Sequence, residues 1–104
     1  IENLKLSNDV INFYVSKNLK QNAFFVSKKN RMILNNEFFE QPYEIVFRAF
    51  SDIVKIIGGK YYPPRGKKLD KIIDEIKNGK LSKATLGGCM IEKVNLTVII
   101  SREY

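Results

Sequence analysis

The segment from Lys60 to Lys68 contains the residues best suited to bind a polyanion. Its nine residues hold two tyrosines, two prolines and four cations, namely Lys60, Arg65, Lys67 and Lys68. Cationic side chains neutralise phosphates, and a tyrosine ring can stack on an exposed base, which contributes about 1–3 kcal/mol per base. The segment therefore predicts contact with RNA. The alternative is that Tyr61 and Tyr62 pack beneath the loop as core, with Pro63-Pro64 only starting the next helix.

The net positive charge is concentrated in the same part of the chain. The 104 residues carry 18 Lys+Arg against 11 Asp+Glu, a net charge of +7. Residues 55–83 hold nine basic and three acidic residues, so they account for +6 of that excess. Such a concentration is typical of proteins that bind a polyanion. RNA or DNA is the first candidate, and an anionic membrane is the second. The alternative is a lysine-rich face that serves solubility alone.

The sequence excludes several kinds of catalytic site. It has no histidine and one cysteine, so it can form neither a Ser-His-Asp triad nor a His-ligated or Cys-rich metal site. Gly58-Gly59-Lys60 lacks the spacing of a phosphate-binding loop and follows a predicted helix instead of preceding one. Cys89 has no activating partner nearby in the sequence, and we predict that it is a small buried strand residue. We therefore expect no catalytic residue, cofactor or metal in this chain.

Length and composition bound the organisation of the chain. At 104 residues it is expected to form a single domain over residues 1–104. No apolar run reaches the roughly 20 residues needed to span a bilayer, so no membrane partner is expected. A lone thiol suits a reducing cytosol, which favours a cytoplasmic location. Because the chain starts at Ile1 and not at Met, we expect it to be an excised piece of a longer protein.

The hydrophobic pattern predicts an α+β fold, a small helical domain with one or two antiparallel β-hairpins. Apolar residues at helical spacing favour helices over 8–19, 43–57 and 65–77, and three or four helices in all. Short apolar runs on either side of Lys28-Lys29-Asn30 predict a hairpin over 23–34. A second hairpin is expected to turn near Lys93–Asn95, with a third strand over 84–86. Gly87-Gly88 is interpreted as a bulge or sharp turn, and Thr85-Leu86-Gly87-Gly88 is expected to pack this hairpin against the helices and not to contact RNA.

Three amphipathic faces are predicted for these helices. The 43–57 helix carries the broadest stripe and is expected at the centre of the core: Ile45, Val46, Ala49, Phe50, Ile53, Val54 and Ile57. Gly58-Gly59 should end it, since glycine adopts the left-handed conformation of a helix C′ position. The 65–77 helix presents Leu69, Ile72, Ile73 and Ile76. The 8–19 helix presents positions 11, 14, 15 and 19, and its asparagines 12 and 18 weaken that prediction.

Several of these segments form one ordered pattern. It runs from Gly58-Gly59-Lys60-Tyr61-Tyr62-Pro63-Pro64-Arg65 through an amphipathic helix to Thr85-Leu86-Gly87-Gly88-Cys89 and then Ser101-Arg102-Glu103. This pattern resembles the region downstream of the catalytic PP-loop domain in bacterial tRNA(Ile)-lysidine synthetases. The resemblance is clearest over 42–103 and rests on hydrophobic pattern alone over 8–41.

The resemblance implies a parent enzyme, an ATP-dependent tRNA(Ile)-lysidine ligase. Such an enzyme adenylates C2 of the wobble cytidine of tRNA(Ile) with ATP and then joins lysine there. In that family ATP, with Mg, binds a Ser-Gly-Gly-x-Asp-Ser loop of an N-terminal α/β domain, and this chain contains no such motif. No catalytic residue can therefore be carried over, and the chain alone is expected to be inactive. The implied role is that of a domain that grips and orients tRNA(Ile) beside the catalytic domain of the same chain.

The candidate nucleic-acid-binding residues lie in the basic segment: Lys60, Tyr61, Arg65, Lys67, Lys68 and Lys71. Arg102 is an additional, weaker candidate for phosphate contact. One alternative is a free-standing basic module that binds RNA or DNA. Another is a structural domain that holds the catalytic part of the parent or forms a homodimer. Exposed apolar positions on the 8–19 helix would favour this last hypothesis.

Overall fold

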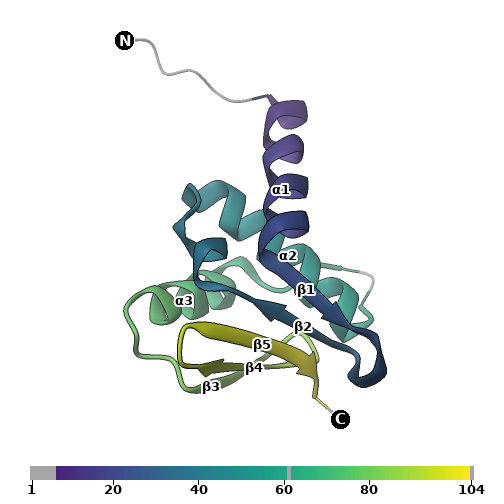
Figure 1. Ribbon diagram of the computed structural model, residues 1–104, viewed down its shortest axis with the longest axis vertical. Helices are drawn as coiled ribbons and strands as arrows, with labels where there is room; N and C mark the ends of the chain where they lie inside the picture. Colours follow the sequence, from purple (N-terminus) through teal and green to yellow (C-terminus); the bar gives the residue numbers. More distant parts are fainter. Residues whose placement is uncertain (1–6, 61, 104) are drawn as a thin grey trace.

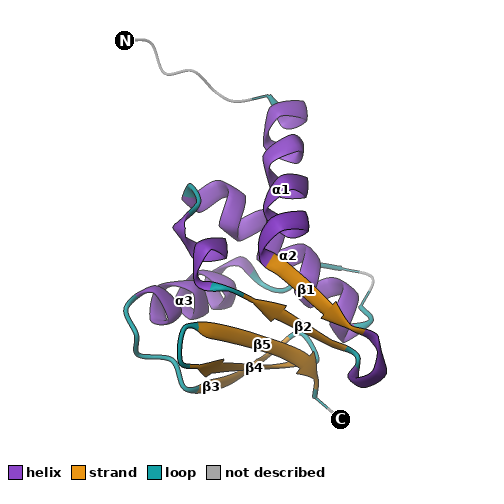
Figure 2. Cartoon of the chain, viewed as in Figure 1, coloured by secondary structure: helices purple, strands orange, loops and turns teal. Residues whose placement is uncertain are grey.

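The computed structural model describes residues 7–60 and 62–103, and this part of the chain folds as three α-helices and one five-stranded sheet (Figures 1 and 2). The helices are α1 (Asn8–Asn22), α2 (Tyr43–Gly58) and α3 (Gly66–Lys77). The strands are β1 (Ala23–Val26), β2 (Arg31–Leu34), β3 (Lys83–Leu86), β4 (Cys89–Val94) and β5 (Thr97–Arg102). The predicted α+β fold class is confirmed.

The sheet joins the two predicted hairpins into one antiparallel layer. Its strand order is β1-β2-β5-β4-β3, so β1 and β2 form one hairpin and β3, β4 and β5 form a meander. Pairing of β2 with β5 connects them, with Leu34 opposite Val98 and Met32 opposite Ile100. Lys83–Leu86 confirms the third strand of the second hairpin. The turn between β4 and β5 lies one residue later than predicted, at Asn95 and Leu96, where Asn95 has a positive φ of 58°.

Helix α2 crosses one face of the sheet and forms the centre of the core. All seven residues of its predicted stripe are buried. They face the side chains that alternate along the strands toward the helices, such as Ile91 of β4 and Ile100 of β5. Helix α3 packs beside α2 and next to β3, and its four predicted apolar residues are also buried. The predictions for both helices are confirmed.

Helix α1 is longer than predicted and buries polar side chains. Its buried face contains Ile11 and Val15, but also Asn18 and Asn22, while Tyr14 is 48% exposed. The prediction that Tyr14 belongs to the buried face is wrong. Asn18 can occupy that face because its amide donates to the Phe38 carbonyl oxygen at 3.3 Å and accepts from Asn22 at 2.8 Å, which satisfies its polar groups away from water.

This asparagine network fixes α1 to the segment that follows β2. The Asn35 side chain donates to Asn22 Oδ1 at 3.2 Å, and Asn35 Oδ1 accepts from the Phe38 backbone at 3.0 Å. A 3₁₀ turn over Asn36–Glu40, which the hydrophobic pattern did not predict, therefore packs Phe38 into the core. No helix within the described ranges is long and apolar enough to cross a bilayer.

Candidate nucleic-acid interface

The basic loop begins where α2 ends. Gly59 adopts the left-handed conformation (φ 69°) and its N–H bonds back to the Ile56 carbonyl, which closes the helix as predicted. Lys60 follows, its N–H donating to the Lys55 carbonyl at 3.3 Å. The chain then passes Pro63-Pro64 and enters α3 at Gly66. Tyr61 was predicted to contact RNA and lies outside the described residues.

The turn between β3 and β4 packs against the end of α2. Gly87 and Gly88 both have positive φ, 58° and 82°, so this two-residue turn depends on glycine. A Cβ placed on Gly58 would overlap the carbonyl oxygen of Gly87, which shows how closely the two backbones approach. The predicted packing of this turn against the helices is therefore confirmed. Its position brings a bare backbone edge next to the basic loop.

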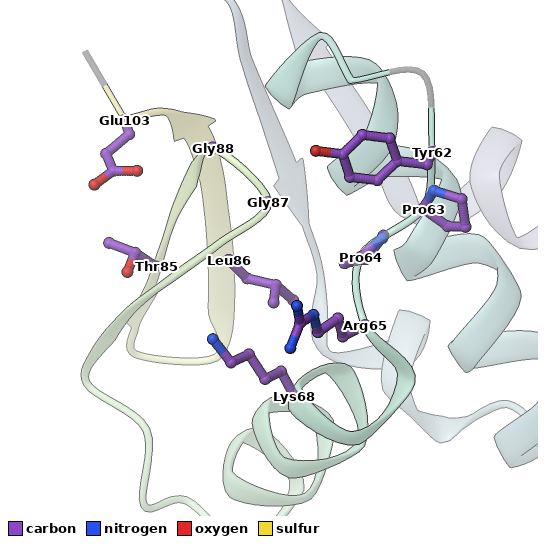
Figure 3. Close-up of a pocket in the computed structure, with 10 residues that line it drawn as sticks. All are labelled: Tyr62, Pro63, Pro64, Arg65, Lys68, Thr85, Leu86, Gly87, Gly88 and Glu103. Carbon is purple, nitrogen blue, oxygen red and sulfur yellow. The ribbon is translucent and has the colours of Figure 1, made fainter.

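A depression of about 380 Å³ lies between the loop, the first turn of α3 and the β3–β4 turn (Figure 3). We call it the turn depression. Tyr62 and Pro64 line one side, Gly87 and Gly88 the other, and the depression is completed by Pro63, Arg65, Lys68, Thr85, Leu86 and Glu103. In Figure 3 the side chains of Arg65 and Lys68 extend from the helix side toward the β3–β4 hairpin. The two cations thus converge on one hollow from positions one helical turn apart.

Tyr62 is not part of the core. Its side chain is 64% exposed, and Figure 3 shows its hydroxyl pointing toward the Gly87-Gly88 turn. The alternative in which this ring packs beneath the loop is therefore wrong. An exposed tyrosine above a hollow with cations at its edge has the geometry needed for stacking on a base next to a bound phosphate.

The other predicted cations divide between two surfaces. The aliphatic stem of Lys60 lies against the same glycine turn, since a Cβ on Gly88 would be 3.4 Å from the Lys60 Cε. Lys67 and Lys71 lie on a different side of α3, where they line a shallow surface with Tyr43, Asp70 and Asp74. We call this surface the α3 face. The structure therefore brings Lys60, Arg65 and Lys68 to the glycine turn and separates Lys67 and Lys71 from them.

Among the described residues, no carboxylate forms an ion pair with the cations of the turn depression. Across residues 7–60 and 62–103, the one ion pair within 4.0 Å joins Arg48 to Glu44, at 2.8 Å and far along α2. Glu103 is the acidic residue of the turn depression, and Figure 3 shows it at the opposite end from Arg65. The depression is therefore cationic on its α3 side, where a phosphate would be attracted most strongly.

Comparison with known proteins finds two relatives, and both are named tRNA(Ile)-lysidine synthase. The protein from Hyphomonas neptunium is 40% identical over 55 residues, which is 52% of this chain and 15% of the relative. The protein from Wolbachia sp. subsp. Brugia malayi is 33% identical over 70 residues, 65% of this chain and 16% of the relative. The chain resembles a segment of the tRNA(Ile)-lysidine synthases. The resemblance expected from the ordered motifs is thereby confirmed.

The match covers only a small part of these synthases, about one sixth of the length of each relative. No family model matches the chain. No solved structure matches it either.

Arg102, the additional candidate, makes a structural contact in this chain. Its Nε donates to the Ile57 carbonyl oxygen at 3.0 Å, while the residue as a whole is exposed. A cation at this position satisfies an unpaired carbonyl and the negative end of the α2 dipole. Lys93 makes the equivalent contact at the end of α3, where Nζ donates to the Ile76 carbonyl at 3.2 Å. Phosphate contact by Arg102 stays a prediction.

Cys89 is fully buried, as predicted, and its surroundings do not activate it. Its thiol donates to the Val54 carbonyl oxygen at 3.3 Å. Burial raises the pKa of the Cys89 thiol from 9.0 to about 11, an effect larger than the opposing influence of the Arg102 charge. Because the thiolate is the reactive form of cysteine, this residue is a poor nucleophile at neutral pH.

Sequence reasoning missed two members of the interface. Glu103 lies beside the glycine turn because its N–H donates to the Gly88 carbonyl at 2.9 Å. Tyr43 lies beside Lys67 and Lys71 because the start of α2 approaches the middle of α3. Neither position could be found from local spacing, since each depends on how two distant segments pack.

Proposed function

We propose that this chain is a non-catalytic tRNA-binding domain of a tRNA(Ile)-lysidine synthase. On this proposal the parent enzyme is a cytoplasmic ligase that joins lysine to C2 of the wobble cytidine of tRNA(Ile). ATP, with Mg, would bind the N-terminal domain of the parent, and this domain would present the tRNA to it. The names of the two relatives and the ordered motifs support this assignment.

The residues of this chain do not fit an ATP site of their own. Gly58-Gly59-Lys60, the glycine-rich segment nearest to a phosphate loop in composition, closes the C-terminus of α2. Carbonyl groups with partial negative charge end a helix there, whereas phosphate loops use the N–H groups at a helix start. We therefore assign no catalytic step to this chain, and we expect the chain alone to be inactive.

The observation that carries the proposal is the turn depression. It combines an exposed ring, Tyr62, with two cations that have no carboxylate within 4.0 Å among the described residues, Arg65 and Lys68. Phosphates would bind the cations and an accessible base would stack on the ring. Lys60 and the α3 face, with Lys67 and Lys71, would extend this contact along the polyanion.

The test is the salt dependence of tRNA binding. Each phosphate contact adds about 0.7–0.9 to the magnitude of the slope of log K against log salt concentration. Replacing both cations, Arg65→Ala with Lys68→Ala, should therefore reduce the magnitude of the slope by about 1.4–1.8 and weaken binding at low salt. The matched control is Lys77→Ala with Lys80→Ala, which also lowers the net charge from +7 to +5. Lys77 is the last residue of α3, about 14 Å along the helix axis from Lys68, and Lys80 follows the end of the helix.

The control pair separates a localised contact from a general charge effect. We expect the control variant to retain nearly the slope and affinity of the unmodified chain. Equal losses in the two variants would mean that only net charge matters. No measurable binding of tRNA by the unmodified chain at low salt would refute the proposal outright.

A second function is favoured by one observation, the exposed apolar side chains of α1. Phe13 is 62% exposed, and its ring meets that of Tyr14 edge to face at 5.2 Å. Exposed aromatic rings on one helix suit an interface, and here the partner would be the catalytic domain of the parent or a second copy of the chain. Sedimentation of the chain against concentration tests the dimer. A mass of 12.1 kDa at all concentrations would exclude it, and Phe13→Ser should dissociate a dimer if one forms.

A further inference from the structure

The two sides of the turn depression differ in a way that matches one particular ligand. The loop side presents the exposed ring of Tyr62, whose hydroxyl points toward the glycine turn, and the ring of Pro64. The opposite side is the backbone of Gly87 and Gly88, flanked by the side chains of Thr85 and Leu86. The volume of the turn depression, about 380 Å³, lies within the range of small-ligand sites, roughly 300–1,000 Å³. This volume has room for one aromatic base beside the exposed Tyr62 ring.

Charge gives the depression a direction. Arg65 and Lys68 lie at the α3 end, and the Glu103 carboxylate lies at the other end (Figure 3). A phosphate at the Glu103 end would be repelled, and the same group at the α3 end would be attracted. A ligand that carries a ring at one end and an anion at the other would therefore bind in one orientation.

We propose that the turn depression binds an unpaired nucleotide, with its phosphate on Arg65 and Lys68 and its base against Tyr62. This inference rests on the proposed function and deepens it, because it names the part of an RNA that the turn depression binds. A base inside a duplex has both faces covered by its neighbours and cannot stack on a side chain. The ring of Tyr62 can be used only by a nucleotide in a loop, at a bulge or at a strand end.

The test compares two probes that differ only in an unpaired segment. One is a blunt RNA duplex, and the other is the same duplex with a short single-stranded overhang. We expect the chain to bind the overhang probe more tightly. Tyr62→Ala should lower affinity for the overhang probe by about 5- to 150-fold and leave the blunt probe unchanged. Tyr62→Phe, which keeps the ring, should retain the preference.

A second tyrosine supplies the matched control. Tyr14 is 48% exposed, but it lies on α1 and does not line the turn depression. Tyr14→Ala should leave the preference for the overhang unchanged. Glu103→Gln should strengthen binding of both probes, most at low salt, because it removes the one carboxylate among the described residues that line the depression.

Failure of this inference differs from failure of the proposed function. If the overhang adds no affinity, or if Tyr62→Ala weakens both probes equally, no unpaired nucleotide binds at Tyr62. Arg65→Ala with Lys68→Ala would still weaken both probes if the domain binds RNA through phosphates alone. If that double variant changes neither probe, the proposed function itself is wrong.

Discussion

Gly58 is the position at which the structure predicts the largest effect of one added methyl group. A Cβ there would overlap the Gly87 carbonyl oxygen, closer than the 3.0 Å below which real Cβ atoms essentially never occur, and would also be 3.4 Å from the Cys89 sulfur. Gly58→Ala should gain at most about 1 kcal/mol from helix propensity. Against this, overpacking against a rigid backbone costs about 1–3 kcal/mol.

The overlap also strains two hydrogen bonds of the glycine turn. These are Cys89 Sγ to the Val54 carbonyl and Glu103 N–H to the Gly88 carbonyl, and each typically contributes about 1 kcal/mol. We therefore expect Gly58→Ala to lower the free energy of unfolding by about 2 kcal/mol. In a domain of about 100 residues this corresponds to a decrease in Tm of about 8–16 °C.

Urea unfolding followed by circular dichroism measures this change, with Gly66→Ala as the matched control. Gly66 is the first residue of α3, and a Cβ there would meet Phe47 at 3.8 Å, an ordinary contact. The same chemical change should therefore be neutral or stabilise by up to about 1 kcal/mol. If Gly58→Ala unfolds at the same urea concentration as the unmodified chain, α2 and the β3–β4 turn do not pack as described.

Three further predictions concern groups that make hydrogen bonds near the helix ends. Arg102→Met removes the donor to the Ile57 carbonyl and should cost about 1–3 kcal/mol in urea unfolding, and an unchanged midpoint would contradict its capping role. Asn22→Ala breaks the bonds to Asn18 and Asn35, and we expect a loss of about 1–3 kcal/mol, whereas an unaltered Tm would contradict the buried network. The pKa of Cys89 is raised to about 11 in the folded chain, so the unfolded thiol ionises first, and the free energy of unfolding should fall as pH rises from about 9 to about 11. Cys89→Ala should show a smaller decline over that range, and equal declines would mean that other groups cause it.

Much of the fold could be predicted because it depends on local pattern. The stripe on α2, from Ile45 to Ile57, repeats at helical period over three turns, so its buried face follows from spacing alone. Short polar turns likewise marked the β1–β2 hairpin. In contrast, the pairing of β2 with β5 joins Leu34 to Val98, and no local signal says which of several apolar strands will be neighbours.

The buried face of α1 was predicted wrongly in part because residue type is an incomplete guide to burial. Asn18 is buried since partners from Asn22 and Phe38 satisfy its amide. Those partners lie on the next helical turn and on a segment 20 residues away, so their presence depends on tertiary packing. Tyr14 has a larger apolar surface than Asn18, and yet it lies on the surface of the protein.

The candidate site was predicted by composition but not by arrangement. Helical spacing places Arg65 near Lys68 and Lys67 near Lys71, but it also places Lys68 near Lys71, since residues three or four apart share a side of a helix. Which pair meets the glycine turn depends on how α3 is rotated against β3, and that rotation is set by the burial of Leu69 and its three partners. The sequence could therefore supply the cations but not the hollow that they share.

The central claim is that RNA contacts this chain at the turn depression, and the most direct measurement is an NMR titration of the isotopically labelled chain with tRNA. The amide signals of Gly66, Gly87 and Gly88 report on the depression without any substitution. We predict that these signals shift or broaden first and most, before those of Lys77 and Gly79 at the far end of α3. Changes largest on α1, with the glycine signals of the depression unmoved, would contradict the account.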